Sequence, residues 1–141
     1  MGRALGLDVG TKTIGVAMSD PGRLLASPVR TLARRSVARD TEVLAELVAL
    51  QKVDDIVVGL PLELDGTEER SARLARQIGA ALHERTGIRV HYVDERFTSV
   101  DAERQLIEAG VSRDRRRRVI DQAAAVLILQ SFLAHPELVH E

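Results

Sequence analysis

The hydrophobic positions in the first quarter of the chain recur with the spacing of β-strands. Apolar runs of strand length are separated by two turn-prone segments, Gly10-Thr11-Lys12 and Asp20-Pro21-Gly22. Strands joined by such short turns pair as antiparallel hairpins. We therefore expect three consecutive strands, at Arg3 to Val9, Thr13 to Ser19 and Leu24 to Thr31.

From residue 36 onward, the pattern alternates between helix and strand. Apolar residues recur at helical spacing between residues 36 and 51, with Ser36 or Asp40 as the candidate N-cap. The nearly continuous apolar run from Asp55 to Leu60 is typical of a strand that is buried on both faces. A strand of this kind indicates that part of the sheet is parallel.

The remaining third of the chain continues this alternation. We expect a second helix between Gly66 and Gly87, a strand at Ile88 to Val93, a short helix at Thr98 to Ala109, and a last helix from about Arg116 to Leu133. No internal repeat or linker interrupts the pattern. The sequence therefore predicts a single α/β domain over residues 1–141 with a mixed sheet.

Composition narrows the possible functions. Only 2% of the 141 residues are aromatic, which argues against a surface that stacks nucleic-acid bases. The chain has no cysteine, which excludes disulfides, thiolate metal sites and a cysteine nucleophile. Its formal net charge of -1 means that any polyanion must bind to a local basic patch. Without a membrane-length apolar run or a signal-peptide pattern, we expect a cytoplasmic protein that does not contact membranes.

One acidic residue lies inside the first predicted strand. Because strand side chains alternate between faces, Asp8 shares a face with Gly6 and Gly10. An unpaired carboxylate is costly to bury, and glycines leave room for a close approach to the backbone. This combination is typical of a functional site. The alternative is a carboxylate that caps the following turn through Thr11 or Thr13.

Further acidic residues stand in apolar surroundings at two places in the chain. Asp94 and Glu95 close a predicted strand, and Asp121 falls within an otherwise apolar helix. Sites in α/β sheets form near the carboxyl ends of strands. Three converging carboxylates would suit Mg²⁺ or Mn²⁺, and two such ions can activate water for phosphodiester hydrolysis. The alternative is that Asp94 and Asp121 form ordinary salt bridges with neighbouring arginines.

Four motifs follow one another along almost the whole chain. They are LDVGTK with GVA at residues 7–17, VGLPL with DGT at 58–67, VDERFTS at 93–99, and DQAAAVLIL at 121–129. Together they resemble the YqgF/RuvX family of ribonuclease H-like nucleases, which are described both as Holliday junction resolvases and as pre-16S ribosomal RNA nucleases. The resemblance implies a ribonuclease H-like fold, with a five-stranded mixed sheet flanked by helices.

The same resemblance implies which acids carry the chemistry. Asp8, Glu95 and Asp121 match the family's catalytic, metal-binding positions, and the implied cofactor is Mg²⁺ or Mn²⁺, as two ions. Adjacent strand residues face opposite ways, so only one of Asp94 and Glu95 can face the metals directly. The family pattern favours Glu95.

Basic residues beside these motifs are candidate contacts to backbone phosphates. Arg117 and Arg118 lie four and three residues before Asp121, on nearly the same face of the predicted helix. The simple alternative is a solvated surface cation or, for Arg96, a partner of Asp94. The candidate nucleic-acid-binding residues are Lys12, Arg96, Arg115, Arg116, Arg117 and Arg118.

These features together predict a divalent-metal-dependent endonuclease that hydrolyses nucleic-acid phosphodiester bonds. The resemblance suggests 5′-end maturation of pre-16S ribosomal RNA, with Holliday junction resolution in recombination and repair as the alternative. Paired incision of a four-way junction calls for a symmetric homodimer. The helical stripes are needed to cover the sheet and leave no apolar seam for a dimer, so we favour the RNA substrate.

Two other classes of protein share features with this sequence. A noncatalytic nucleic-acid-binding module of the same fold gains nothing from three negative charges facing phosphate. The Asp-x-Gly-Thr sequence after the first strand also resembles the phosphate loop of sugar kinases and actin-like ATPases. Those proteins close two such domains around a nucleotide, and this chain supplies one.

Overall fold

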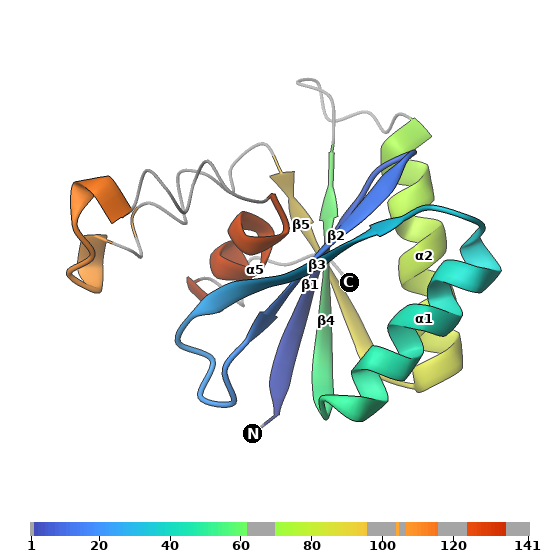
Figure 1. The fold of residues 1–141 in the computed structure, drawn as a ribbon, viewed down its shortest axis with the longest axis horizontal. Coiled ribbons are helices and arrows are strands. Elements are labelled where there is room, and N and C mark those ends of the chain that lie inside the picture. The colour runs from blue at the N-terminus through green and yellow to red at the C-terminus, as the bar shows by residue number, and fades with distance from the viewer. Residues whose placement is uncertain (1, 62–69, 96–103, 105–106, 116–123, 135–141) are drawn as a thin grey trace.

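In a computed structural model, five strands form one mixed sheet that has helices on both faces (Figure 1). The structure describes residues 2–61, 70–95, 104, 107–115 and 124–134. The elements in chain order are β1 (Arg3–Val9), β2 (Thr13–Ser19), β3 (Ala26–Ala33), α1 (Val37–Leu50), β4 (Val53–Leu60), α2 (Arg70–Thr86), β5 (Arg89–Asp94) and α5 (Ala124–Ala134).

The strand order in the sheet is β3-β2-β1-β4-β5. β1, β2 and β3 pair as antiparallel hairpins, while β4 pairs parallel to β1 and β5 pairs parallel to β4. The predicted five-stranded mixed sheet is therefore confirmed. Because β1, β4 and β5 run in the same direction, their carboxyl ends share one edge of the sheet.

The third strand differs from its prediction at both ends. It was expected from Leu24 to Thr31 but runs from Ala26 to Ala33. The carboxylate of Asp20 accepts the backbone N–H groups of Leu24 and Leu25, at 2.8 and 2.9 Å, which holds both residues in the turn. Backbone groups that are occupied in this way cannot join the ladder with β2, so the strand starts later.

The start of α1 and the end of α2 follow the expected capping rules. Ser36 caps α1, and its hydroxyl accepts the N–H of Arg39 at 3.1 Å. Gly87 ends α2 with a φ of 72°, and Gly110 has a φ of 78°, in the left-handed region that suits glycine. The expected start of α2, most of the predicted helix at 98–109 and residues 116–123 lie outside the described residues.

The two faces of the sheet are covered by different helices (Figure 1). α1 and α2 pack on one face over the larger apolar cluster, which includes Leu5, Leu7 and Ile56. α5 covers the other face, over a cluster rich in small residues such as Ala4 and Ala17. Among the described helices, none has both the length and the apolar character needed to cross a bilayer.

α5 lies unusually close to β1 because the strand carries a glycine at the contact. A Cβ atom added to Gly6 would lie 2.7 Å from Leu129 Cβ and 3.0 Å from the carbonyl oxygen of Ala125. Real Cβ atoms do not approach other atoms so closely, so the helix could not keep this position over any larger residue. Gly6 therefore sets how near the helix comes to the strand.

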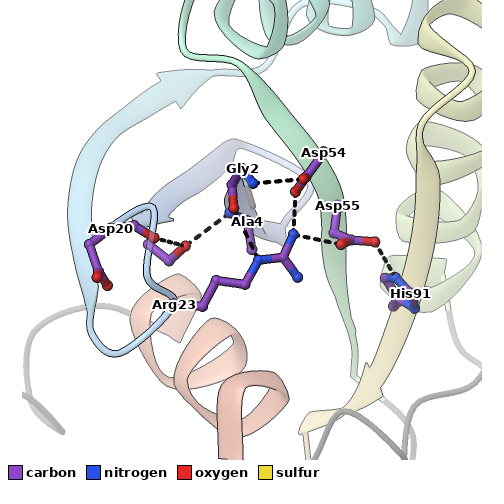
Figure 2. Close-up of polar contacts among 8 residues, drawn as sticks. Gly2, Ala4, Asp20, Arg23, Asp54, Asp55 and His91 are labelled. Atoms are coloured by element: carbon purple, nitrogen blue, oxygen red, sulfur yellow. Dashed lines mark hydrogen bonds and ion pairs between the residues drawn. The ribbon is translucent and has the colours of Figure 1, made fainter.

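A polar network ties the amino ends of β1, β4 and β5 together (Figure 2). Arg23 bonds the carboxylates of Asp54 and, at 2.6 Å, Asp55. The other oxygen of Asp55 lies 2.8 Å from Nε2 of His91, a buried residue. Burial alone would raise the pKa of Asp55, but the hydrogen bonds from His91 and Arg23 hold it below the ordinary value. His91 thus takes part in the contacts that join the strands, away from the edge that carries their carboxyl ends.

Candidate active site

Asp8 lies on the α5 face of the central strand and is half-buried. It stands opposite Gly15 of β2 in the antiparallel register. A Cβ atom added to Gly15 would lie 3.7 Å from Asp8 Cβ and 3.6 Å from Ala125 Cβ. The bare Gly15 thus leaves space beside the carboxylate of Asp8, between the sheet and the first turn of α5.

Glu95 follows β5 directly and reaches across the sheet over β4. A Cβ atom added to Gly59 of β4 would lie 2.8 Å from Glu95 Oε1 and 2.9 Å from Glu95 Cγ, and it would also meet Cδ1 of Ile128. The Glu95 carboxyl therefore occupies the space that a side chain at position 59 would fill. Since β4 separates β5 from β1, this position directs Glu95 toward Asp8.

The Asp8 and Glu95 carboxyl groups interact directly. Burial, the negative charge of Asp8, a hydrogen bond with Asp8 and the charge of Asp94 together raise the pKa of Glu95 to about 8. A hydrogen bond between two carboxyl groups requires a proton, so the pair holds one proton near neutral pH. Two adjacent carboxylates become fully ionised more readily when a cation replaces that proton.

The donor set at this edge is made of carboxylate oxygens, the ligand type that Mg²⁺ and Mn²⁺ prefer. In the described part of the chain, no group of three acidic, histidine or cysteine side chains gathers around one point. The third predicted ligand, Asp121, lies outside the described residues. Asp8 and Glu95 thus form a two-carboxylate centre that fits a divalent cation but leaves part of its coordination shell to other groups.

The predicted phosphate contacts are described only in part. Lys12 is exposed in the turn that follows β1, four residues beyond Asp8. Arg115 is exposed in a short helical segment, where its backbone N–H bonds the hydroxyl of Ser112 at 3.4 Å. The other four candidates lie outside the described residues: Arg96, Arg116, Arg117 and Arg118.

The part that Gly59 plays was not foreseen from the sequence. Gly59, part of the VGLPL motif, lies within β4 and accommodates the Glu95 side chain. A glycine inside a β-branched run is itself an indication of close approach by another group. The identity of that group depends on which strand lies next to β4, and this follows only from the fold.

Relatives with closely similar sequences carry the names of nucleases. A protein of Moorella thermoacetica is 49% identical over 93% of this chain and 94% of its own length. A protein of Myxococcus xanthus is 47% identical over 93% of this chain and 87% of its own. Both are named "Putative pre-16S rRNA nuclease". These names agree with the predicted class of activity.

Solved structures with distant sequences share the fold. RuvC of Thermus thermophilus, in complex with a Holliday junction substrate, superimposes with a TM-score of 0.59 at 14% identity, over 98% of this chain and 96% of that one. The yeast mitochondrial Holliday junction resolvase superimposes with a TM-score of 0.54 at 12% identity, over 94% of this chain and 78% of that one. At such identities the likeness concerns the fold alone, and it confirms the predicted ribonuclease H-like architecture.

The sequence model of one family, described as "RuvX: Holliday junction resolvase", matches residues 2–135. This match covers nearly the whole chain and includes all four of the motifs identified above. The chain therefore belongs to the RuvX family.

Proposed function

We propose that residues 1–141 form a single nuclease domain that hydrolyses phosphodiester bonds with divalent metal ions. The observation that carries this proposal is the hydrogen bond between Asp8, on β1, and Glu95, which directly follows β5; together with burial and the charge of Asp8 it raises the pKa of Glu95 to about 8. A pair of carboxyl groups that cannot both be charged in isolation is costly to maintain in a fold. Binding of a cation explains why such a pair is built at the edge of the sheet.

Asp121 is the proposed third acid. α5 begins at Ala124, and its residue Ala125 lies next to Gly15, the register partner of Asp8. Three residues of chain span at most about 11 Å. Asp121 is therefore within reach of the space beside Asp8, and it completes the ligand set that the family resemblance implies.

When bound, Mg²⁺ or Mn²⁺ at this site would activate a water molecule and stabilise the charge on the leaving oxygen. The role of the protein is to hold the acids in place. Gly59 and Gly15 provide the room, and the sheet fixes the separation of β1 and β5. Asp94 adds negative charge near the pair without taking the place of Glu95.

The substrate we favour is precursor 16S ribosomal RNA, in keeping with the names of the curated relatives. A single site that accepts a single-stranded or loop segment suffices for trimming such an RNA. Action on this substrate would place the protein in the cytoplasm. Lys12, Arg96 and the run Arg115 to Arg118 are the proposed phosphate contacts.

A four-way DNA junction is the second candidate substrate, favoured by the description of the family model. Resolution requires two matched incisions and so a homodimer with two active sites. Sedimentation of the protein alone and with each substrate, together with mapping of the cleavage sites, distinguishes between the two candidate substrates. A stable dimer that makes symmetric nicks in the junction and spares precursor RNA would replace our choice.

The catalytic proposal is tested with three single variants: Asp8→Asn, Glu95→Gln and Asp121→Asn. Each removes one anionic ligand with almost no change of volume, so we expect loss of cleavage with an unchanged circular dichroism spectrum. Glu84→Gln, an exposed acid on α2, is the matched control and should cleave like wild type. The assay uses precursor RNA and a four-way junction, with Mg²⁺, with Mn²⁺ and with chelator.

Two outcomes would contradict the proposal. Wild-type cleavage rates in any two of the three variants at saturating Mn²⁺ would contradict the proposal that the three acids share a metal centre. Tight binding of nucleic acid by the wild type, with no cleavage in either metal, would instead favour a noncatalytic binding module.

A further inference from the structure

We propose that a basic cleft beside the candidate active site binds backbone phosphates of the substrate a few nucleotides from the cleaved bond. This inference rests on the proposed function, because it concerns the substrate of the same site. The cleft has a volume of about 390 Å³ and lies between the β1–β2 turn and the first turns of α2. Its lining residues are Thr11, Arg34, Arg70, Arg73, Leu74 and Gln77.

Two of the three arginines have no ion-pair partner among the residues that the structure describes. Arg34 is engaged, because its Nε lies 2.6 Å from Oδ2 of Asp40, a buried carboxylate. Arg70 and Arg73 are exposed, and no ion pair or hydrogen bond within the described ranges involves either side chain. The cleft therefore presents two positive charges to solvent, in a protein whose formal net charge is -1. Such a local charge attracts polyanions.

One wall of the cleft is fixed to the turn that leads out of the active-site strand. The backbone N–H of Arg34 bonds the carbonyl oxygen of Lys12 at 2.9 Å, and the N–H of Gly10 bonds the carbonyl oxygen of Thr13 at 2.8 Å. These two bonds hold the turn in place against the end of β3. The position of Thr11 in the cleft is thereby tied to the position of Asp8.

The short path from Asp8 to the cleft defines how a substrate strand would run. Thr11 follows Asp8 by three residues, which span at most about 11 Å. This upper limit places the cleft within a few nucleotides of a phosphate bound at Asp8. Asp8 lies on the face of the sheet next to Ala125 of α5, whereas Arg70 belongs to α2. The two helices cover opposite faces of the sheet (Figure 1). The strand would thus cross the end of the sheet at the β1–β2 turn.

The chemistry of the lining selects phosphate over other ligands. Guanidinium groups match phosphate oxygens in pairs, and hydroxyl and amide groups like those of Thr11 and Gln77 are common further donors to the backbone. Among the described residues that line the cleft, none has an aromatic ring on which a base could stack. Binding in the cleft should therefore be independent of base sequence.

A second cavity at the other end of α2 provides a control. It has a volume of about 480 Å³, and its lining includes Lys52 and Arg85 together with Glu46. Both cations are exposed, as in the basic cleft, but an acid lies beside them. The double variant Lys52→Gln/Arg85→Gln therefore removes the same charge from a different surface.

The test measures equilibrium binding of a labelled single-stranded RNA, with chelator present to prevent cleavage. The salt concentration is varied over a roughly tenfold range, from about 0.05 to about 0.5 M. In Arg70→Gln/Arg73→Gln we expect the slope of log affinity against log salt to flatten by about 0.7 to 1.4, since each phosphate contact contributes about 0.7 on single strands. The control double variant should keep the wild-type slope. An uncharged methylphosphonate is then placed at each position near the cleavage site of the RNA.

We expect the wild type to lose affinity when the methylphosphonate lies at one position within a few nucleotides of the cleaved bond, while Arg70→Gln/Arg73→Gln shows no further loss there. The proposed role of the cleft would be overturned if the two double variants changed the salt slope equally. It would also be overturned if the methylphosphonate reduced affinity by the same factor in wild type and in Arg70→Gln/Arg73→Gln. If these results occur while wild type binds and cleaves normally, the nuclease proposal stands. Absence of salt-dependent binding in the wild type would overturn both.

Discussion

Glu95 lies over Gly59, so that a single added carbon on the glycine would fall 2.8 Å from the Glu95 carboxyl oxygen. The acid at the end of β5 thus depends on the absence of a side chain on β4. This dependence means that the position of a proposed metal ligand is set by a residue that carries no chemistry of its own.

Gly59→Ala should reduce metal-dependent cleavage far more than it reduces stability. The new methyl group displaces the flexible Glu95 side chain and also presses on Ile128 of α5. Overpacking of this kind costs roughly 1 to 3 kcal/mol in the free energy of unfolding. Urea unfolding and a cleavage assay on the same sample measure the two effects. The double variant Gly59→Ala/Ile128→Val, which removes Cδ1 of Ile128, should regain stability but not activity; recovery of both would show that Glu95 is not displaced.

The raised pKa of Glu95 makes the metal-free protein less stable as the pH rises. In the unfolded chain Glu95 ionises at its ordinary pKa of 4.5, and in the folded protein at about 8. The folded state therefore binds the extra proton between these values, and the stability that this proton provides is present below pH 4.5 and lost as the pH rises through 8.

Glu95→Gln removes that dependence. In chelator, the melting temperature of the variant should equal that of the wild type at pH 5 and exceed it by about 3 °C or more at pH 8.5. Glu84→Gln, an exposed acid on α2, is the control and should differ from wild type by the same amount at both pH values. Parallel melting curves of wild type and Glu95→Gln across this range would contradict the shared proton.

The network at the amino ends of the strands should respond to pH with the opposite sign. The pKa of Asp55 is held low by His91 and Arg23, so its contribution to stability is present above the ordinary aspartate pKa near 3.8 and lost below it. Asp55→Asn should cost about 1 to 3 kcal/mol at pH 6 and much less at pH 3. Chemical unfolding at the two pH values measures this. An equal cost at both would mean that the charge of Asp55 is unimportant.

The arginine run before α5 should contribute to nucleic-acid affinity without regard to sequence. Arg117→Ala/Arg118→Ala removes two proposed phosphate contacts and should flatten the salt dependence by up to about one unit per contact. RNAs of several unrelated sequences should lose affinity equally, as measured by fluorescence anisotropy. An unchanged slope would identify the run as a solvated surface.

Much of the fold could be predicted because local patterns decide it. The hairpins follow from the turns at residues 10–12 and 20–22, and the parallel half of the sheet follows from the apolar run that forms β4. The start of β3 could not be predicted, because the Asp20 side chain competes with the ladder for the N–H groups of Leu24 and Leu25. Such competition depends on geometry that the apolar pattern does not record.

The candidate site was predictable in its acids but not in the residues that surround them. Asp8 stands out because a carboxylate within a strand is unusual, and Glu95 because a motif marks it. Arg70 and Arg73 carry no such mark, since exposed arginines on a helix are common. Their proximity to Thr11 arises from the way α2 packs on the sheet, which joins segments about sixty residues apart in the sequence.

Three residues of the sheet beneath α5 carry no side chain, and of these Gly6 makes the closest contact with the helix backbone. The height of the helix above the sheet is consequently set by main-chain atoms, which are rigid, rather than by side chains that can repack. A methyl group added at Gly6 would act as a spacer between the strand and the helix, whereas Gly15 would accept one at ordinary van der Waals distances of 3.6 and 3.7 Å. A larger residue at position 6 in a related protein should therefore be read as a difference in helix height, with effects on both ends of α5 at once.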